Sequence, residues 1–170
     1  MLDLEAELDA VIAALTREGV EYAVCGGVAM AIHGFIRATE DLDLFVKPED
    51  TDRVAAAVVG LGFTGSAPMI RRLTKIDQLD GEMLAIDLSP VTPATEQVWQ
   101  MREVVTWNER PLSIVSREGL IALKRLRSTA QDLVDIERLA TGDGNVVRSI
   151  RRLSQLRSLC LSLAKANSQK

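Results

Sequence analysis

Two aspartates, Asp41 and Asp43, stand two residues apart in the alternating run DLDLFV, residues 41–46. Such alternation predicts a β-strand, in which both carboxylates lie on one face while the leucines between them point into the core. Neighbouring carboxylates repel each other and raise each other's pKa, and a bound cation removes this penalty. Magnesium prefers carboxylate oxygens and completes its shell with water and phosphate oxygens. The pair therefore predicts a site for Mg²⁺ or Mn²⁺.

A third carboxylate, Asp87, lies in the apolar segment from Met83 to Leu88, which also has the pattern of a strand. On a neighbouring strand, Asp87 could face the same side as the aspartate pair. Three carboxylates on adjacent strands can hold two metal ions about 4 Å apart, the arrangement used for in-line displacement at phosphorus. The alternative is that Asp87 caps a turn at the end of its strand.

A pair of glycines, Gly26-Gly27, separates the expected strand at residues 21–25 from a short helix expected at residues 28–33. Glycine allows the backbone to approach a phosphate closely, and a helix N-terminus offers N–H groups that have no partner within the helix. Two glycines are a weak signal alone, but a strand with two carboxylates follows within the reach of one helix. We therefore expect the pair to lie against a bound polyphosphate.

The surrounding elements alternate between helices and strands. Helical apolar spacing and end signals predict helices over residues 3–18, 28–33, 48–61, 116–126 and 131–139. Short apolar or alternating runs predict strands over residues 21–25, 41–46, 69–76 and 83–88, with a hairpin turn at Asp80-Gly81. Residues 99–107 fit no single element. This order predicts an α/β (α+β) fold, in which helices flank a small mixed β-sheet and more helices follow it.

These residues together resemble the minimal nucleotidyltransferases of the DNA polymerase beta superfamily. The signature of that group is a Gly-Gly or Gly-Ser turn, a short helix, a strand with Asp-x-Asp and a third carboxylate on a later strand. Within it, GGVAMAIHG, the triplet RAT at residues 37–39 and DLDL are similar to the AbiEii-type toxin nucleotidyltransferases. The segment from Ser116 to Leu139 also resembles this group, where a helical lysine precedes a helix rich in Arg and Asp.

The resemblance, which covers about residues 5–140, implies transfer of a nucleoside monophosphate from an NTP to an acceptor hydroxyl, with pyrophosphate leaving. It implies that the catalytic metal ligands are Asp41, Asp43 and Asp87. It implies that the nucleotide is bound by Gly26, Gly27, Arg37, Thr39 and Lys124. Lys124 would contact the triphosphate as a compact point charge. Asp132 or Asp135 matches a helical acid of the family.

Structural alternatives exist for several of these residues. The aspartate pair could lie on a solvent-exposed strand edge, and the two helical acids could be surface residues paired with Arg138. Arg37 either contacts phosphate or pairs with Glu40. Lys124 belongs to a basic run of the kind that is usually a solvated helix face. Both tryptophans are expected to pack in the core rather than to stack on a base. His33 is expected to have a structural role at a helix end rather than a catalytic one.

Composition and charge limit the class of protein. Of 170 residues, 47% are hydrophobic and 26% charged, which is typical of a globular domain. No apolar run has the length of a membrane span, and the N-terminus lacks the features of a signal peptide. Cys25 and Cys160 cannot by themselves form a disulfide framework or a four-ligand zinc site. We therefore expect a cytoplasmic protein that does not contact membranes.

The charge is unevenly distributed along the chain. Residues 1–145 contain 14 basic and 24 acidic residues, whereas residues 146–170 contain six basic residues and no acid. We divide the chain into a nucleotidyltransferase domain with a helical C-terminal part, residues 1–142, and a basic helical tail, residues 143–170. The tail is either a solvated helical end or a local contact to nucleic acid.

Three functions fit the sequence. The first is metal-dependent transfer of a nucleoside monophosphate to RNA, such as a tRNA end, by the toxin of a toxin–antitoxin pair, which would add a cognate antitoxin as a partner. The second is the same reaction on another acceptor, either a small molecule such as an aminoglycoside or a protein hydroxyl. The third is a catalytically degenerate nucleotide-binding module.

Overall fold

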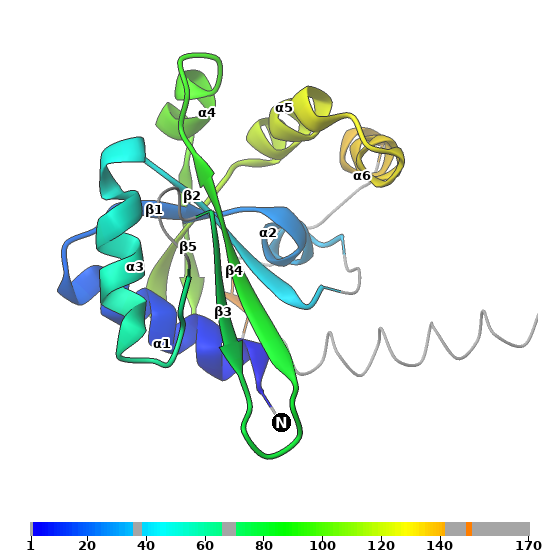
Figure 1. Ribbon diagram of the computed structural model, residues 1–170. Helices are drawn as coiled ribbons and strands as arrows, with labels where there is room; N and C mark the ends of the chain where they lie inside the picture. Colours follow the sequence, from blue (N-terminus) through cyan, green and yellow to red (C-terminus); the bar gives the residue numbers. More distant parts are fainter. Residues whose placement is uncertain (1, 36–38, 66–70, 142–148, 151–170) are drawn as a thin grey trace, which may run out of the picture.

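The computed structural model describes residues 2–35, 39–65, 71–141 and 149–150 (Figure 1). In this part of the chain seven strands form one mixed sheet in the order β3-β4-β2-β1-β6-β5-β7. The strands are β1 (Tyr22–Val24), β2 (Asp41–Val46), β3 (Arg72–Ile76), β4 (Met83–Pro90), β5 (Glu103–Trp107), β6 (Arg110–Ile114) and β7 (Ser149–Ile150). The helices are α1 (Leu4–Arg17), α2 (Gly26–Ile32), α3 (Thr51–Val59), α4 (Glu96–Gln100), α5 (Arg117–Arg127) and α6 (Ala130–Thr141), with a 3₁₀ turn, η1 (Pro48–Asp50). The predicted mixed sheet flanked by helices is confirmed.

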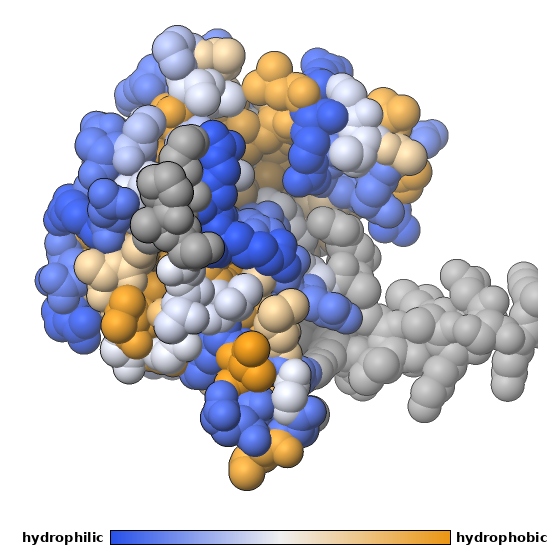
Figure 2. Space-filling model, in the orientation of Figure 1, coloured by the Kyte–Doolittle hydropathy of each residue, from blue (hydrophilic) through white to orange (hydrophobic). Residues whose placement is uncertain are grey.

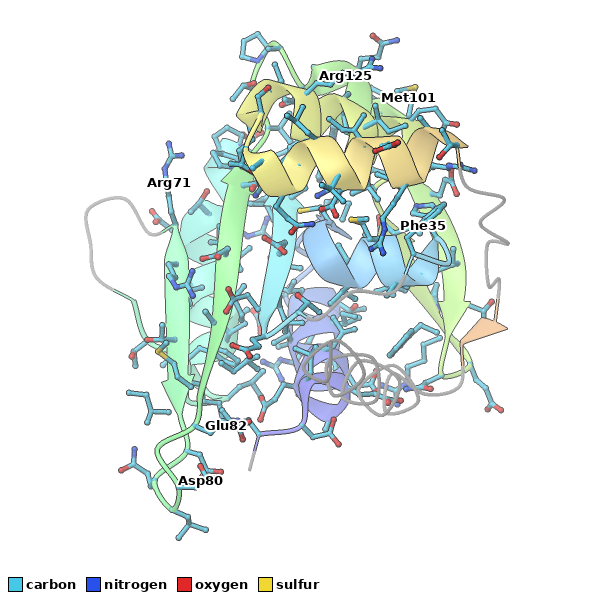
Figure 3. The ribbon with its side chains drawn as sticks, turned by 90° about the vertical axis from the view of Figure 1, so that its right-hand side faces the viewer. Phe35, Arg71, Asp80, Glu82, Met101 and Arg125 are labelled. Carbon is cyan, nitrogen blue, oxygen red and sulfur yellow. The ribbon has the colours of Figure 1, made fainter. Side chains whose placement is uncertain are left out.

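Helices cover both faces of the sheet. In Figures 1 and 3, α1 and α3 lie on one face, and α2, α5 and α6 lie on the other. The apolar stripe of α1 explains its position, because Leu8, Val11 and Leu15 are buried while the acids of its first turn are not. The alternation in β2 likewise buries one face of the strand, since Leu42 and Leu44 are fully buried.

The segment without a clear prediction, residues 99–107, contains the end of α4 and all of β5. β6 was not predicted. It pairs with β5 through a two-residue turn, Asn108-Glu109, in which both residues have positive φ, 44° and 65°. Hairpin turns of this shape usually contain glycine, and this one does not, so Asn108 is the only turn signal in the sequence there.

Both tryptophans are buried, as expected of core residues. The Trp99 ring meets Phe45 edge to face with 5.7 Å between the ring centroids, and Trp107 Nε1 donates a hydrogen bond of 2.7 Å to Asp9 Oδ1. His33 follows the last residue of α2, is buried, and has Nε2 2.9 Å from the carbonyl oxygen of Val115. This contact joins α2 to the segment before α5, so His33 has a structural role.

Most of the predicted basic tail lies outside the described residues. Its described part, Ser149–Ile150, is a short strand parallel to β5. The division of the chain at residue 142 therefore stays a prediction. Within the described ranges, no helix has both the length and the apolar character needed to cross a membrane.

Candidate active site

The sheet brings the three predicted carboxylates to one face. β2 and β4 are parallel neighbours, and their register places Asp43 beside Asp87 and Asp41 beside Ala85. Because residues two apart on a strand point to the same side, Asp41 shares the face of Asp43 and Asp87. The alternative of a solvent-exposed edge does not apply to the pair, since β2 lies between β4 and β1.

A residue that sequence reasoning missed, Arg72, links two of these carboxylates. It begins β3 and pairs in register with Asp87. Its Nη1 donates to both oxygens of Asp87 at 3.1 and 2.8 Å, and its Nη2 donates to both oxygens of Asp41 at 3.2 and 3.3 Å. Figure 2 shows hydrophilic residues over this side of the sheet, beside a hollow that separates it from α5.

The charge of the site favours a bound cation. Burial raises the pKa of Asp87, and the negative charge of Asp41 raises it further, against the opposing effect of Arg72. A guanidinium already lies between Asp41 and Asp87, so this position selects positive charge. Among the described residues, no group of three His, Cys, Asp or Glu side chains adopts a metal-binding arrangement. The donors are nevertheless carboxylate oxygens on rigid strands, which fits Mg²⁺ or Mn²⁺.

Gly26 and Gly27, which were expected to form a turn before the helix, are instead the first two residues of α2, and they lie directly against this site. Gly26 has φ +59°, and a Cβ built there would lie 1.8 Å from Asp43 Oδ2. The backbone N–H before it, from Cys25, donates to the carbonyl oxygen of Asp43 at 2.9 Å. Figure 3 shows α2, which begins at this turn, beside β2 and below the α5–α6 pair. The turn therefore has glycine because a side chain would displace a predicted metal ligand.

The second glycine is also confined, though less tightly than the first. A Cβ at Gly27 would lie 2.6 Å from Thr39 Oγ1, and this hydroxyl donates to the carbonyl oxygen of Asp41 at 3.3 Å. Thr39 thus connects the glycine turn to the start of β2. Its contact with a nucleotide stays a prediction, and Arg37 lies outside the described residues.

Lys124 is not a solvated residue. Its side chain is 4% exposed, and Nζ lies 2.6 Å from Asp135 Oδ2 and 3.4 Å from Asp132 Oδ1. Arg127 donates to both oxygens of Asp132 at 2.8 and 2.6 Å, and the hydroxyl of Thr129 donates to Oδ2 at 2.6 Å. These donors hold the pKa of Asp132 well below its usual range.

This cluster defines a role for the two helical acids. They are fully buried rather than surface residues, and they balance the charge of Lys124 and join α5 to α6. In this conformation the ammonium group of Lys124 points toward Asp132 and Asp135. Arg127, on the same helix, keeps 58% of its side chain exposed. Binding of the triphosphate by Lys124 stays a prediction.

Comparison with known proteins finds one family model and several solved structures that are similar to this chain. A family model described as aminoglycoside-2''-adenylyltransferase matches residues 7–132. The lincomycin-bound structure of the lincosamide antibiotic adenylyltransferase LnuA matches with a TM-score of 0.56 and 17% identity, over 81% of this chain and 96% of that one. The solution structure of the antibiotic-resistance factor ANT(2'')-Ia matches with a TM-score of 0.56 and 16% identity, over 97% and 95%.

The crystal structure of ANT(2'')-Ia in complex with adenylyl-2''-tobramycin also matches, with a TM-score of 0.54 and 17% identity, over 94% of this chain and 98% of that one. No curated protein sequence matches the chain. At these identities the solved structures show a shared fold.

The solved structures give the fold, and the family model gives the class of enzyme. Because the family model matches most of its length, the chain belongs to the aminoglycoside-2''-adenylyltransferase family and is a nucleotidyltransferase enzyme. The superfamily expected from the glycine turn and the Asp-x-Asp strand is thereby confirmed. The comparisons do not support the narrower AbiEii-type relationship.

Proposed function

We propose that this enzyme transfers AMP from ATP to a hydroxyl group of an aminoglycoside-like small molecule and releases pyrophosphate. The observation that carries the proposal is the family match over residues 7–132, which contains the glycine turn and all three aspartates of the site. The match favours the small-molecule alternative over an RNA acceptor and a cognate antitoxin, which no comparison supports.

Each part of the site has a proposed task. When bound, Mg²⁺ or Mn²⁺ would neutralise the triphosphate and the leaving pyrophosphate, and Asp41, Asp43 and Asp87 would hold it. Asp87, whose pKa is raised, is suited to take the proton of the acceptor hydroxyl on its carboxylate. The missing side chain at Gly26 lets the backbone lie directly against the Asp43 carboxylate, so phosphate oxygens of a nucleotide bound at Asp43 would lie beside this backbone.

Charge supports a cationic acceptor. Residues 1–145 carry a net charge of −10, from 14 basic and 24 acidic residues. Such a surface attracts a polycation such as an aminoglycoside and repels the phosphate backbone of RNA. The matching structures agree with a small-molecule acceptor, since one is lincomycin-bound and another is a complex with adenylyl-2''-tobramycin.

The test is a matrix of four labelled NTPs against tobramycin, lincomycin and total RNA, with Mg²⁺ present. We expect label from ATP on tobramycin, stoichiometric with released pyrophosphate. Asp43→Asn should abolish the product, whereas Asp52→Asn, which removes a charge from an exposed position on α3, should not.

Three results would count against the proposal. Label that enters RNA alone, with a rate falling steeply as salt is raised, would restore the RNA acceptor. Label on lincomycin alone would keep the reaction and correct the acceptor. Absence of turnover with every pair of substrates, in protein that still binds ATP, would identify a degenerate nucleotide-binding module.

A further inference from the structure

We propose that Arg72 is an internal counter-ion, which holds Asp41 and Asp87 together while the enzyme is free of metal and must leave when a divalent cation binds. The inference rests on the proposed metal-dependent function and assigns a positioning role to a residue outside the expected site.

The geometry gives Arg72 the same ligands that the cation needs. One planar guanidinium contacts both oxygens of Asp87 through Nη1 and both oxygens of Asp41 through Nη2, at 2.8 to 3.3 Å. A divalent ion held by these carboxylates would use the same lone pairs. The guanidinium of Arg72 and the metal ion therefore compete for the same carboxylate oxygens.

The position of Arg72 in the sheet makes its departure easy. β3 is one of the two edge strands of the described sheet, and the Arg72 side chain is 48% exposed. Ion pairs that are this accessible to solvent are weak, because water and salt screen them. The side chain of Lys124, by contrast, is only 4% exposed, so its ion pairs with Asp132 and Asp135 are shielded from water and salt.

Without Arg72, the metal-free site would lose the cation between its carboxylates. Asp41 and Asp87 would then repel each other, as the effect of Asp41 on the pKa of Asp87 already indicates. Replacing Arg72 by a neutral residue should thus have two opposite effects. It should destabilise the protein in the absence of metal, and it should strengthen the binding of metal.

The experiment compares the wild type, Arg72→Gln and Arg71→Gln. Arg71 is the matched control, because it has the same charge as Arg72 and is exposed directly before the start of β3, where Figure 3 shows its side chain directed away from the sheet. Binding of Mn²⁺ alone is measured by electron paramagnetic resonance without nucleotide. The melting temperature is measured in EDTA and again with saturating Mn²⁺.

For Arg72→Gln we expect Mn²⁺ binding about fivefold tighter than for the wild type, equivalent to about 1 kcal/mol. Its melting temperature in EDTA should fall by about 2–4 °C, and Mn²⁺ should restore it. Arg71→Gln should match the wild type in both measurements.

Unchanged or weaker Mn²⁺ binding by Arg72→Gln would overturn the inference. An equal effect of Arg71→Gln would also overturn it, since net charge alone would then be the cause. If adenylyl transfer is retained in these cases, the proposed function stands and only the counter-ion role fails. If neither the wild type nor Arg72→Gln binds Mn²⁺, and transfer needs no metal, the inference and the proposed metal site fail together.

Discussion

Replacing Gly26 by alanine tests whether the glycine turn and Asp43 form one unit. A Cβ at Gly26 would lie 1.8 Å from Oδ2 and 2.3 Å from Cγ of Asp43, so the carboxylate must move. Gly19 is a matched control, because its φ of +61° is almost the same as the +59° of Gly26, and no atom lies within 4 Å of a Cβ built there.

The two substitutions separate backbone strain from steric displacement. An alanine at positive φ costs about 1–2 kcal/mol at either position. Displacement of packed atoms adds about 1–3 kcal/mol, and only Gly26→Ala incurs it. We therefore expect Gly26→Ala to lose about twice as much unfolding free energy as Gly19→Ala, with each kcal/mol lowering the melting temperature by about 2–4 °C.

The assay is urea unfolding followed by circular dichroism, together with release of pyrophosphate. A shift of about 1 Å in a catalytic group can cost roughly 100-fold in rate, so Gly26→Ala should lose at least that much kcat while Gly19→Ala keeps it. In an Asp43→Ala background the two closest atoms are gone, and Gly26→Ala should then cost less stability. Equal stability losses for both glycine variants, with activity retained in Gly26→Ala, would refute the reasoning.

Three further predictions concern buried groups. Lys124→Met should lower the unfolding free energy by about 3–5 kcal/mol, because it leaves two buried carboxylates without their cation. The control Arg125→Met, at an exposed position of the same helix, should lower it by less than about 0.5 kcal/mol. Denaturant titration measures both values. The depressed pKa of Asp132 stabilises the fold fully above about pH 4, and this stabilisation is lost as pH falls through the folded-state pKa, so Asp132→Asn should flatten the acid side of the stability profile. Burial, aided by the charge of Asp43, raises the pKa of the Cys25 thiol. In a Cys160→Ser variant, iodoacetamide at pH 8 should therefore label only the unfolded protein, as measured by mass spectrometry. Rapid labelling of the native protein would contradict this prediction, because it would show that the Cys25 thiol is accessible.

Local pattern in the sequence was sufficient for the core of the site. Strict alternation in β2 places Asp41 and Asp43 on one face and their leucine neighbours in the core, because side chains alternate along any strand. Apolar spacing and caps likewise predicted α1, α5 and α6 almost to the residue. Each of these features depends only on residues within a few positions of each other.

The register between β3 and β4 could not be predicted from local sequence pattern. Asp80-Gly81 correctly predicted a hairpin, but a two-residue turn there would pair Thr74 with Asp87. The loop from residue 77 to residue 82 instead joins Ile76 to Met83, so Arg72 comes beside Asp87. A shift of two residues along the strand thus decides which side chain contacts the carboxylates.

Burial was also decided by tertiary structure. The basic run in α5 has the pattern of a solvated face, yet Lys124 is buried because α6 packs against α5 and supplies Asp132 and Asp135. Sequence alone determined which residue types were available for nucleotidyl transfer and which of them share a strand face. The packing of α6 on α5 and the pairing of β3 with β4 decided which charges meet, since these contacts join residues whose separation along the chain carries no local signal.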